Sequence, residues 1–276
     1  MQSVIKTVEP HDSIERYTEL GVNVVTGEAK IISPWEVEVK TDDGIKRLTT
    51  RSIVIAAGAS PFIPPIPGID KIEPLTSDNI WNLRELPKRL LVLGGGPIGS
   101  ELAQSFTRLG SQVTQVEMVS RLLVREDLDV SEAVMARFRE EGVDLRMEHT
   151  GKEFIVENGE KILIAEHQGQ PVKIPFDQVL FAIGRSANLK GYGVEELGIE
   201  LSPRKTIATN GFQETNYPNI YAVGDVAGPY QFTHTAAHQA WYAAQRLVRN
   251  FQEIPYRLFG DSLVNFHRPG SGSCGH

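Results

Sequence analysis

Cysteine is nearly absent from this sequence of 276 residues, which contains a single one, Cys274, close to the carboxyl end. One thiol excludes an intramolecular disulfide, a CxxC motif and a metal site made from several cysteines. A relay in which two thiols of the chain exchange electrons is excluded for the same reason. The sequence therefore predicts no disulfide-based turnover by this chain.

Long apolar runs and clusters of basic residues are missing as well. No run approaches the about 18 apolar residues of a membrane span, and residues 1–20 carry acids where a signal peptide has an apolar core. We therefore expect a cytoplasmic protein with no membrane partner. The net charge of -7, without clustered Lys and Arg, argues against nucleic acid as a partner. The composition that remains, 41% hydrophobic and 23% charged, is typical of a globular protein, and the length allows two domains.

The most informative stretch runs from Arg89 to Glu117 and predicts a strand, a glycine turn, a helix and a second strand. Its apolar start is typical of a strand buried on both faces, and it leads directly into a GxGxxG motif at Gly94, Gly96 and Gly99. Such a motif also occurs as a plain tight turn. The flanking strands, the helix and the terminal acid favour a dinucleotide-binding site.

Each position of the turn has a physical role in binding a pyrophosphate. Gly94 permits the tight turn, Gly96 lets the backbone approach the ligand, and Gly99 lets the helix pack close to the strand. Pro97 and Ile98 open the helix, whose unpaired N–H groups would face the phosphates.

Glu117 follows the second strand, where a carboxylate can accept hydrogen bonds from both ribose hydroxyls. The acid favours NAD(H), because it would repel the 2′-phosphate of NADP(H). Arg121 and Arg125 lie just beyond it and could turn toward a 2′-phosphate, so NADP(H) stays possible. The alternative is that both arginines are solvated loop charges.

Simpler patterns flank this stretch. Residues 1–20 predict a helix, residues 21–50 a small antiparallel meander that includes Val22 and Val24, and residues 52–58 a short buried strand. The proline-rich stretch 61–67 predicts a connecting segment.

After Glu117 the sequence predicts a helix capped by Asp129, with Val134, Met135 and Phe138 buried. Strands are expected at residues 143–147, 154–156, 161–165 and 179–183. Together these elements predict a compact dinucleotide domain of the α/β class.

Residues 220–228 predict a buried strand that ends in Gly224 and Asp225, ahead of a helix over 234–250. Asp225 would lie at the carboxyl end of a strand, where α/β sheets bind ligands, or it would cap the helix. The predicted packed face of the helix consists of Ala236, Ala237, Ala240 and Leu247. His234 and His238 share a helix face but have no third ligand, so no metal site is predicted.

Four segments of the chain together resemble the pyridine nucleotide-disulfide oxidoreductases, flavoproteins that include glutathione reductase, dihydrolipoamide dehydrogenase and mercuric reductase. The segments are IVIAAGASPFIPPIPG, LVLGGGPIGSELA, FAIGRSANL, and IYAVGDVAG followed by QFTHTAAHQA. The resemblance implies an oxidoreductase that binds FAD and NAD(H) and passes a hydride from the nicotinamide to the flavin.

The resemblance also implies a domain order. A Rossmann-like NAD(P)-binding domain, residues 83–198, would be inserted in a partial FAD-binding domain formed by residues 1–82 and 199–250. Residues 251–276 would be the start of a dimerisation domain, through which full-length relatives form homodimers.

Individual roles carry over to matching positions. Asp225, after Gly224, would bind a ribityl hydroxyl of FAD, and Thr233 with His234 would lie beneath the isoalloxazine. Glu101 matches the glutamate that pairs with a flavin-domain lysine near the site of hydride transfer. The other positions implied in cofactor binding are Ala57, Gly58, Gly184 and Arg185.

Several parts of the family pattern are not found in this sequence. They are the first GxGxxG for FAD, the CxxxxC pair, the lysine that partners Glu101, and the dimerisation domain. Read one base out of frame, residues 264–275 resemble the entry into that domain, so we expect a frameshifted chain that starts at an internal methionine. The expected product is an inactive or partial fragment. The alternatives are a non-enzymatic NAD(H)-binding module and a flavin reductase of the ferredoxin-reductase type.

Overall fold

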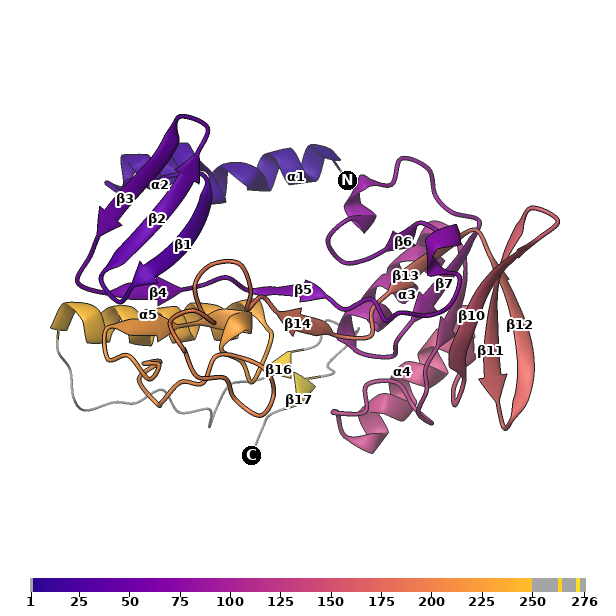
Figure 1. Cartoon of the computed structure of the whole chain (residues 1–276). Helices are drawn as coiled ribbons and strands as arrows, with labels where there is room; N and C mark the ends of the chain where they lie inside the picture. Colours follow the sequence, from indigo (N-terminus) through magenta and orange to yellow (C-terminus); the bar gives the residue numbers. More distant parts are fainter. Residues whose placement is uncertain (1, 250–262, 265–271, 274–276) are drawn as a thin grey trace. The chain divides into compact units, whose positions relative to one another are not determined.

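A computed structural model describes residues 2–249, 263–264 and 272–273 (Figure 1). Cys274 and most of the expected dimerisation segment lie outside the described residues. The chain divides into two compact units. The first unit contains the described residues up to Ser60 together with Ser186 to residue 249, and the second unit contains Pro61–Arg185. Two short paired strands, β16 (Leu263–Val264) and β17 (Gly272–Ser273), group with the second unit.

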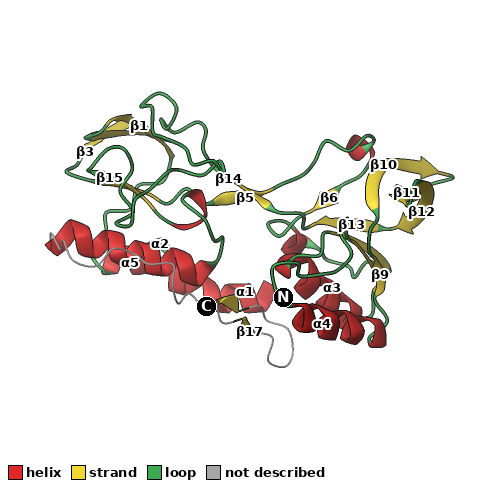
Figure 2. Ribbon diagram, turned by 90° about the horizontal axis from the view of Figure 1, so that it is seen from below, coloured by secondary structure: helices red, strands yellow, loops and turns green. Residues whose placement is uncertain are grey.

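The second unit is built on a five-stranded parallel sheet with the order β6, β13, β7, β8, β9. Its strands are β6 (Pro74–Leu75), β7 (Arg89–Leu93), β8 (Gln112–Val116), β9 (Asp144–Arg146) and β13 (Gln178–Phe181). Two helices, α3 (Pro97–Leu109) and α4 (Leu128–Glu140), cover one face. An antiparallel sheet of β10 (Thr150–Glu157), β11 (Glu160–His167) and β12 (Gln170–Phe176) covers the other face (Figure 2).

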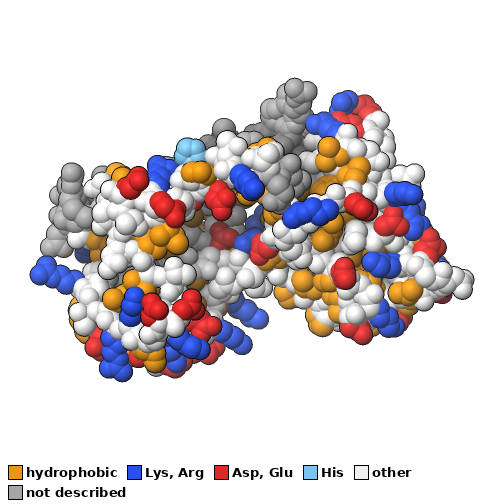
Figure 3. Space-filling model, turned by 90° about the horizontal axis from the view of Figure 1, so that it is seen from above, with side chains coloured by type: hydrophobic (Ala, Val, Ile, Leu, Met, Phe, Trp, Pro, Cys, Tyr) orange, Lys and Arg blue, Asp and Glu red, His pale blue; other side chains and the backbone are white. Residues whose placement is uncertain are grey.

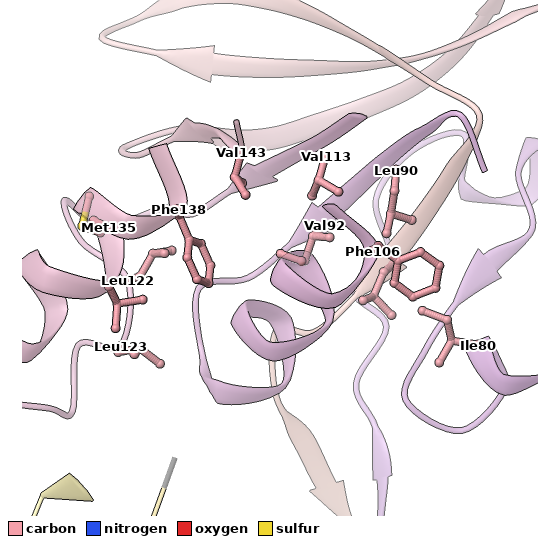
Figure 4. Packing of buried hydrophobic residues seen from close by; sticks show 13 residues of the cluster. Ile80, Leu90, Val92, Phe106, Val113, Leu122, Leu123, Met135, Phe138 and Val143 are labelled. Carbon is pink, nitrogen blue, oxygen red and sulfur yellow. The ribbon is translucent and has the colours of Figure 1, made fainter. Parts of the chain in front are cut away.

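Strand β7 is buried on both faces, as the apolar run predicts. Leu90 and Val92 join the cluster beneath the two helices, which includes Phe106 and Phe138 (Figure 4). The intervening residues of the strand pack against the three-stranded sheet instead. Because side chains alternate along a strand, one strand contributes to both cores and fixes the glycine turn that follows it.

One local expectation in this unit is wrong, and one strand was not expected. Helix α4 begins after Asp127, whereas Asp129 lies in its first turn and accepts a hydrogen bond from the N–H of Val130. The expected burial of Val134, Met135 and Phe138 is confirmed. Strand β12, which contains two prolines, is not among the expected strands. The structure accommodates them because β12 is an edge strand, where a missing N–H costs little.

The first unit contains short helices, an antiparallel meander and a small parallel sheet. The expected first helix is divided into α1 (Gln2–Val8), a 3₁₀ turn (Glu9–Asp12) and α2 (Ile14–Glu19). The meander consists of β1 (Glu28–Ser33), β2 (Glu36–Thr41) and β3 (Gly44–Thr49). Val22 and Val24 precede it without strand structure, which differs from the expectation. Strand β4 (Ile53–Ile55) pairs in parallel with β15 (Ile220–Ala222), ahead of helix α5 (Thr233–Arg249).

Helix α5 packs through a different face from the one predicted. Thr235, Gln239 and Ala243 are buried, whereas Ala237, Ala240 and Leu247 are exposed. Ala243 contacts Tyr221 and Val223 in one cluster, on the face of β15 opposite Ile220. The prediction followed the apolar residues, but polar groups occupy two of the buried positions.

The compact units differ in extent from the domains expected at 83–198 and around it. The second unit begins at Pro61, because β6 lies upstream of the glycine motif and pairs with β13. It ends at Arg185, because Val194 and Ile199 belong to the core of the first unit. Strands β5 (Ala59–Pro61) and β14 (Arg185–Ala187), which pair with each other, carry the chain into and out of the segment Pro61–Arg185.

On the face shown in Figure 3, acidic and basic side chains are interspersed. Among the residues that the structure describes, no helix combines the length and the apolar character needed to cross a bilayer.

Candidate functional site

The predicted site residues of the second unit gather at one edge of its parallel sheet. Strands β7, β8 and β13 are neighbours that run in the same direction, so their carboxyl ends meet. The glycine turn follows β7, Glu117 follows β8, and Gly184 with Arg185 follows β13. Parallel α/β sheets bind ligands at this edge.

The three glycines of the motif have distinct surroundings. Gly94 has a φ of 110°, and a Cβ there would lie 2.7 Å from the carbonyl carbon of Ala182. Gly99 is buried, and a Cβ on it would collide with the carbonyl oxygen of Gly94. A Cβ on Gly96 would meet no atom within 4 Å. Two glycines are therefore required by packing, whereas Gly96 borders open space that a phosphate can occupy.

Helix α3 starts at this open space. Pro97 is its first residue, and Gly96 at the cap has an extended backbone and no side chain to bind the free N–H groups. Ile98 and Gly99 follow in the first turn, where amides have no partner within the helix. Glu101 lies in the same helix and is half-buried. The start of α3 is therefore suited to bind an anion.

Backbone N–H groups bind the carboxylate of Glu117. Its Oε2 accepts from the N–H of Gly95 at 2.5 Å, and its Oε1 accepts from Met118 at 2.7 Å and from Val119 at 3.2 Å. The side chain is half-buried at the carboxyl end of β8, next to the glycine turn. It is thus oriented before any ligand arrives.

Arg121 is engaged in the loop that follows Glu117. Its guanidinium donates to the carbonyl oxygens of Val124 at 3.0 Å, Glu126 at 3.1 Å and Asp127 at 3.5 Å. It thereby links the loop to the start of α4. Arg125 is exposed. These bonds favour the structural alternative for Arg121 over a 2′-phosphate ligand.

Gly184 and Arg185 lie at the end of β13. Gly184 has a φ of 127°, and a Cβ on it would meet nothing within 4 Å. The guanidinium of Arg185 donates to Ser77 Oγ at 3.2 Å and lies 3.6 Å from the carboxylate of Asp78. These contacts fix the segment that leaves the sheet.

The predicted residues of the first unit form a second group. Because β4 and β15 are parallel neighbours, Ala57 and Gly58 come to the same edge as Gly224 and Asp225. Asn188 holds the first pair: its side chain donates to the carbonyl of Ala57 at 2.9 Å, and its N–H donates to that of Gly58 at 3.0 Å.

Gln239 of α5 holds the other half of this group. Its Oε1 accepts from the N–H of Gly224 at 2.6 Å, and its Nε2 donates to the carbonyl of Gly228 at 2.8 Å. Thr233 and His234 are exposed at the start of α5, and the ring of His234 stacks on Phe232 with centroids 5.4 Å apart. Asp225 is half-buried, so the group presents a carboxylate, a helix start and a glycine with a φ of 74°. These groups fit the polar parts of a flavin dinucleotide.

Sequence reasoning missed three glutamine and asparagine side chains that organise these backbones. They are Gln115 beneath the glycine turn, Asn188, and Gln239. No local pattern marks Gln115 or Gln239, because polar residues stand directly before each of them, Thr114 and His238. Asn188 has no local signal either, because its contacts are with residues far away in the sequence.

An ion pair that lowers the pKa of a carboxyl lies away from both groups. Arg89 binds Asp177 through its side chain at 2.8 Å and through its N–H, which holds the pKa of that carboxyl below its usual value. This pair lies at the amino-terminal ends of β7 and β13, opposite the glycine turn, and borders a hollow lined also by Lys88 and Gln112. No group of three potential metal ligands occurs in the described part of the chain.

Comparison with known proteins identifies the class. The sequence profile described as pyridine nucleotide-disulphide oxidoreductase matches residues 3–240, and this chain belongs to that family. The predicted family and the α/β fold with its parallel sheet are thereby confirmed. Members are oxidoreductases that use a flavin and a nicotinamide dinucleotide.

Individual relatives cover most of this chain. It is 36% identical to a mercuric reductase from Staphylococcus aureus over 238 residues. The aligned region covers 86% of this chain and 42% of that protein. It is 31% identical over 270 residues to a dihydrolipoyl dehydrogenase from Chlamydia trachomatis, with coverages of 94% and 57%. The chain spans about half the length of the curated relatives it matches.

Solved structures show the same fold. The crystal structure of LpdA from Mycobacterium tuberculosis matches with a TM-score of 0.85 at 26% identity, covering 97% of this chain and 60% of that one. A Cu(II) complex of the HOCl-induced flavoprotein disulfide reductase RclA from Escherichia coli matches with a TM-score of 0.76 at 31% identity, covering 82% and 51%.

Proposed function

We propose that the second unit binds NADH at its glycine turn. The pyrophosphate would lie against Gly96 and the start of α3, and the adenine-side ribose against Glu117. The observation that carries this proposal is the carboxylate of Glu117, fixed by backbone N–H groups beside the open space at Gly96. Helix N–H groups bind phosphate oxygens, and a carboxylate accepts from two ribose hydroxyls.

NADH is the preferred nucleotide in this proposal. Glu117 would repel a 2′-phosphate at short range. Arg121, the nearest cation of the loop, already donates to three carbonyl oxygens. Binding of NADPH would have to break these bonds or rely on the exposed Arg125.

We further propose that the first unit contributes to an FAD site in an NADH-dependent flavin oxidoreductase. Asp225 would accept from a ribityl hydroxyl, Ala57 and Gly58 would present backbone groups, and Thr233 with His234 would lie at the helix end whose dipole stabilises negative charge. When bound, the flavin supplies the hydride acceptor for the reduced nicotinamide. The protein's own part is to orient the two cofactors, with Glu101, Gly184 and Arg185 toward the nicotinamide.

A titration with NADH tests nucleotide binding. The Gly96→Ala variant should weaken binding at least about tenfold, because the new methyl group occupies the space proposed for the pyrophosphate. Its unfolding midpoint should stay unchanged, since a Cβ there meets no atom within 4 Å. Ser105→Ala, on the exposed side of α3, is the matched control and should bind NADH normally. Equal NADH affinity of the Gly96→Ala variant and the unaltered chain would refute the proposed site.

The visible spectrum after incubation with FAD and removal of the excess tests the flavin site. A retained band that bleaches with NADH supports the oxidoreductase. A protein that binds NADH but retains no flavin would be the alternative, an NAD(H)-binding module. The observation that supports this alternative is that the residues proposed to bind NADH all belong to the second unit.

A further inference from the structure

Gln115 lies beneath the glycine turn and has no exposed surface. It belongs to β8, and its Nε2 donates to the carbonyl oxygen of Gly94 at 3.0 Å. The same amide lies 3.4 Å from Ser100 Oγ, which donates in turn to the carbonyl of Gly95 at 3.5 Å. One side chain and one hydroxyl thus hold the carbonyl groups of two successive residues of the turn.

Gln115 and Glu117 act on the turn from the same strand. They are two residues apart at the end of β8, so their side chains leave it on the same face. Gln115 binds the carbonyl of Gly94, and Glu117 binds the N–H of Gly95, which is the same peptide group. The end of β8 therefore fixes one peptide of the turn from both of its polar atoms.

Stability alone does not explain a glutamine at this position. Its Oε1 is buried and has no hydrogen-bond partner among the described residues. An unpartnered buried carbonyl costs free energy, and its neighbour on the same strand face, Val113, is apolar and buried. An unbranched apolar side chain of equal length would avoid this cost, but it would remove the amide that donates to the carbonyl of Gly94. A side chain whose oxygen stays unpaired while its amide fixes a ligand-binding turn is the pattern expected of a positioning residue.

We infer that Gln115 is a positioning residue, which holds the Gly94–Gly95 peptide in the orientation that leaves the turn open to a pyrophosphate. The inference rests on the proposed NADH site. It assigns Gln115 no contact with the nucleotide. Its effect should therefore be confined to ligands that carry the pyrophosphate.

The test compares Gln115→Met with Gln104→Met. Methionine matches glutamine in length and has no donor. Gln104 is a second buried glutamine, on α3, and its amide binds Glu141 away from the turn. Both variants and the unaltered chain are titrated with NADH, ADP-ribose and adenosine, and their thermal unfolding is recorded.

Gln115→Met should weaken NADH and ADP-ribose about tenfold, the effect of one lost hydrogen bond transmitted to the ligand. Adenosine, which has no pyrophosphate, should bind all three proteins within about twofold. The unfolding midpoint of Gln115→Met should change little, because removal of the unpaired Oε1 offsets the loss of the donor to Gly94. Gln104→Met should bind every ligand normally.

Two results would overturn the inference. One is normal binding of NADH and ADP-ribose by Gln115→Met, and the other is equal weakening of all three ligands with a lowered midpoint, which indicates a general structural role. If the unaltered chain binds no NADH, the proposed function itself fails, and the inference with it. A failure limited to Gln115 leaves the NADH site intact.

Discussion

The carboxylate of Glu117 accepts a hydrogen bond from the N–H of Gly95 across 22 residues of sequence. The bond joins the end of β8 to the turn that follows β7. Met118 and Val119 donate to the other oxygen. The acid proposed to set nucleotide preference and the turn proposed to receive the phosphates are therefore one connected structure, and a change in either should alter the other.

Glu117→Gln should weaken NADH binding about tenfold, because charge-assisted hydrogen bonds are lost and the orienting backbone donors then meet an amide. NADPH should lose less affinity, since the repulsion of its 2′-phosphate disappears. Fluorescence titration with NADH and with NADPH measures the ratio of the two affinities. Glu132→Gln, an exposed acid on α4, is the control. An unchanged NADH to NADPH ratio in Glu117→Gln would contradict the assigned role.

Gly95→Ala should weaken NADH binding through Glu117. The new Cβ would lie 2.9 Å from Oε2 of Glu117 and 2.7 Å from Cδ2 of the buried Leu122, so the carboxylate must move. Overpacking of this kind costs about 1–3 kcal/mol of unfolding free energy. Chemical denaturation together with NADH titration should show both losses in Gly95→Ala, whereas Gly96→Ala should lose binding alone. A Gly95→Ala variant with native stability and affinity would show that the contact is easily relieved.

Asn188→Ala should loosen the Ala57–Gly58 backbone in the first unit. The substitution removes the hydrogen bond to the carbonyl of Ala57 and the hydrogen bond from Ser60 Oγ at 2.8 Å. Together the two losses should lower the free energy of unfolding by about 1–2 kcal/mol. The unfolding midpoint and the amount of retained FAD should both fall. Ser60→Ala removes one of the two bonds and should have the smaller effect. If Asn188→Ala retains FAD as the unaltered chain does, Asn188 has no part in shaping that edge.

Asp177→Asn should change how the free energy of unfolding depends on pH in acid. Arg89 holds the pKa of Asp177 below its ordinary value of 3.8, chiefly through side-chain hydrogen bonds. A carboxyl whose pKa is lowered in the folded protein stabilises the fold fully at a pH above its pKa in the unfolded chain. This contribution is lost as the pH falls through the lower pKa of the folded protein. The partly exposed pair contributes about 1 kcal/mol at most. Denaturation curves at pH 7 should give a higher free energy of unfolding for the unaltered chain than for Asp177→Asn, and this difference should shrink below pH 3.8. A pH-independent difference would mean that Asp177 acts only as a hydrogen-bond acceptor.

The sequence predicts those parts of the structure whose signals are local. The strand, glycine turn and helix around Gly94 combine an apolar run, a motif and a proline at the first helical position. The structure contains each element within one residue of its expected limits at β7 and α3. The burial of Phe138 and its neighbours on α4 follows in the same way from helical spacing.

The rest depends on contacts that no local pattern contains. Proline argues against a strand, yet β12 tolerates it because β12 happens to lie at a sheet edge. Apolar spacing misplaced the packed face of α5, because Gln239 is buried by its bonds to Gly224 and Gly228. The compact second unit starts before the expected domain because it includes β6, which is two residues long and is recognised only by its pairing with β13.

Because β5 pairs with β14, the two ends of the segment between them lie next to each other. The chain enters and leaves the segment Pro61–Arg185 on this one ribbon, where the N–H of Phe62 donates to the carbonyl of Gly184 at 2.9 Å. An insertion whose entrance and exit are adjacent can be exchanged by splicing at two neighbouring points, without re-routing the host chain. The segment Pro61–Arg185, with the nucleotide site proposed for it, can therefore be replaced as a cassette, by recombination or by design.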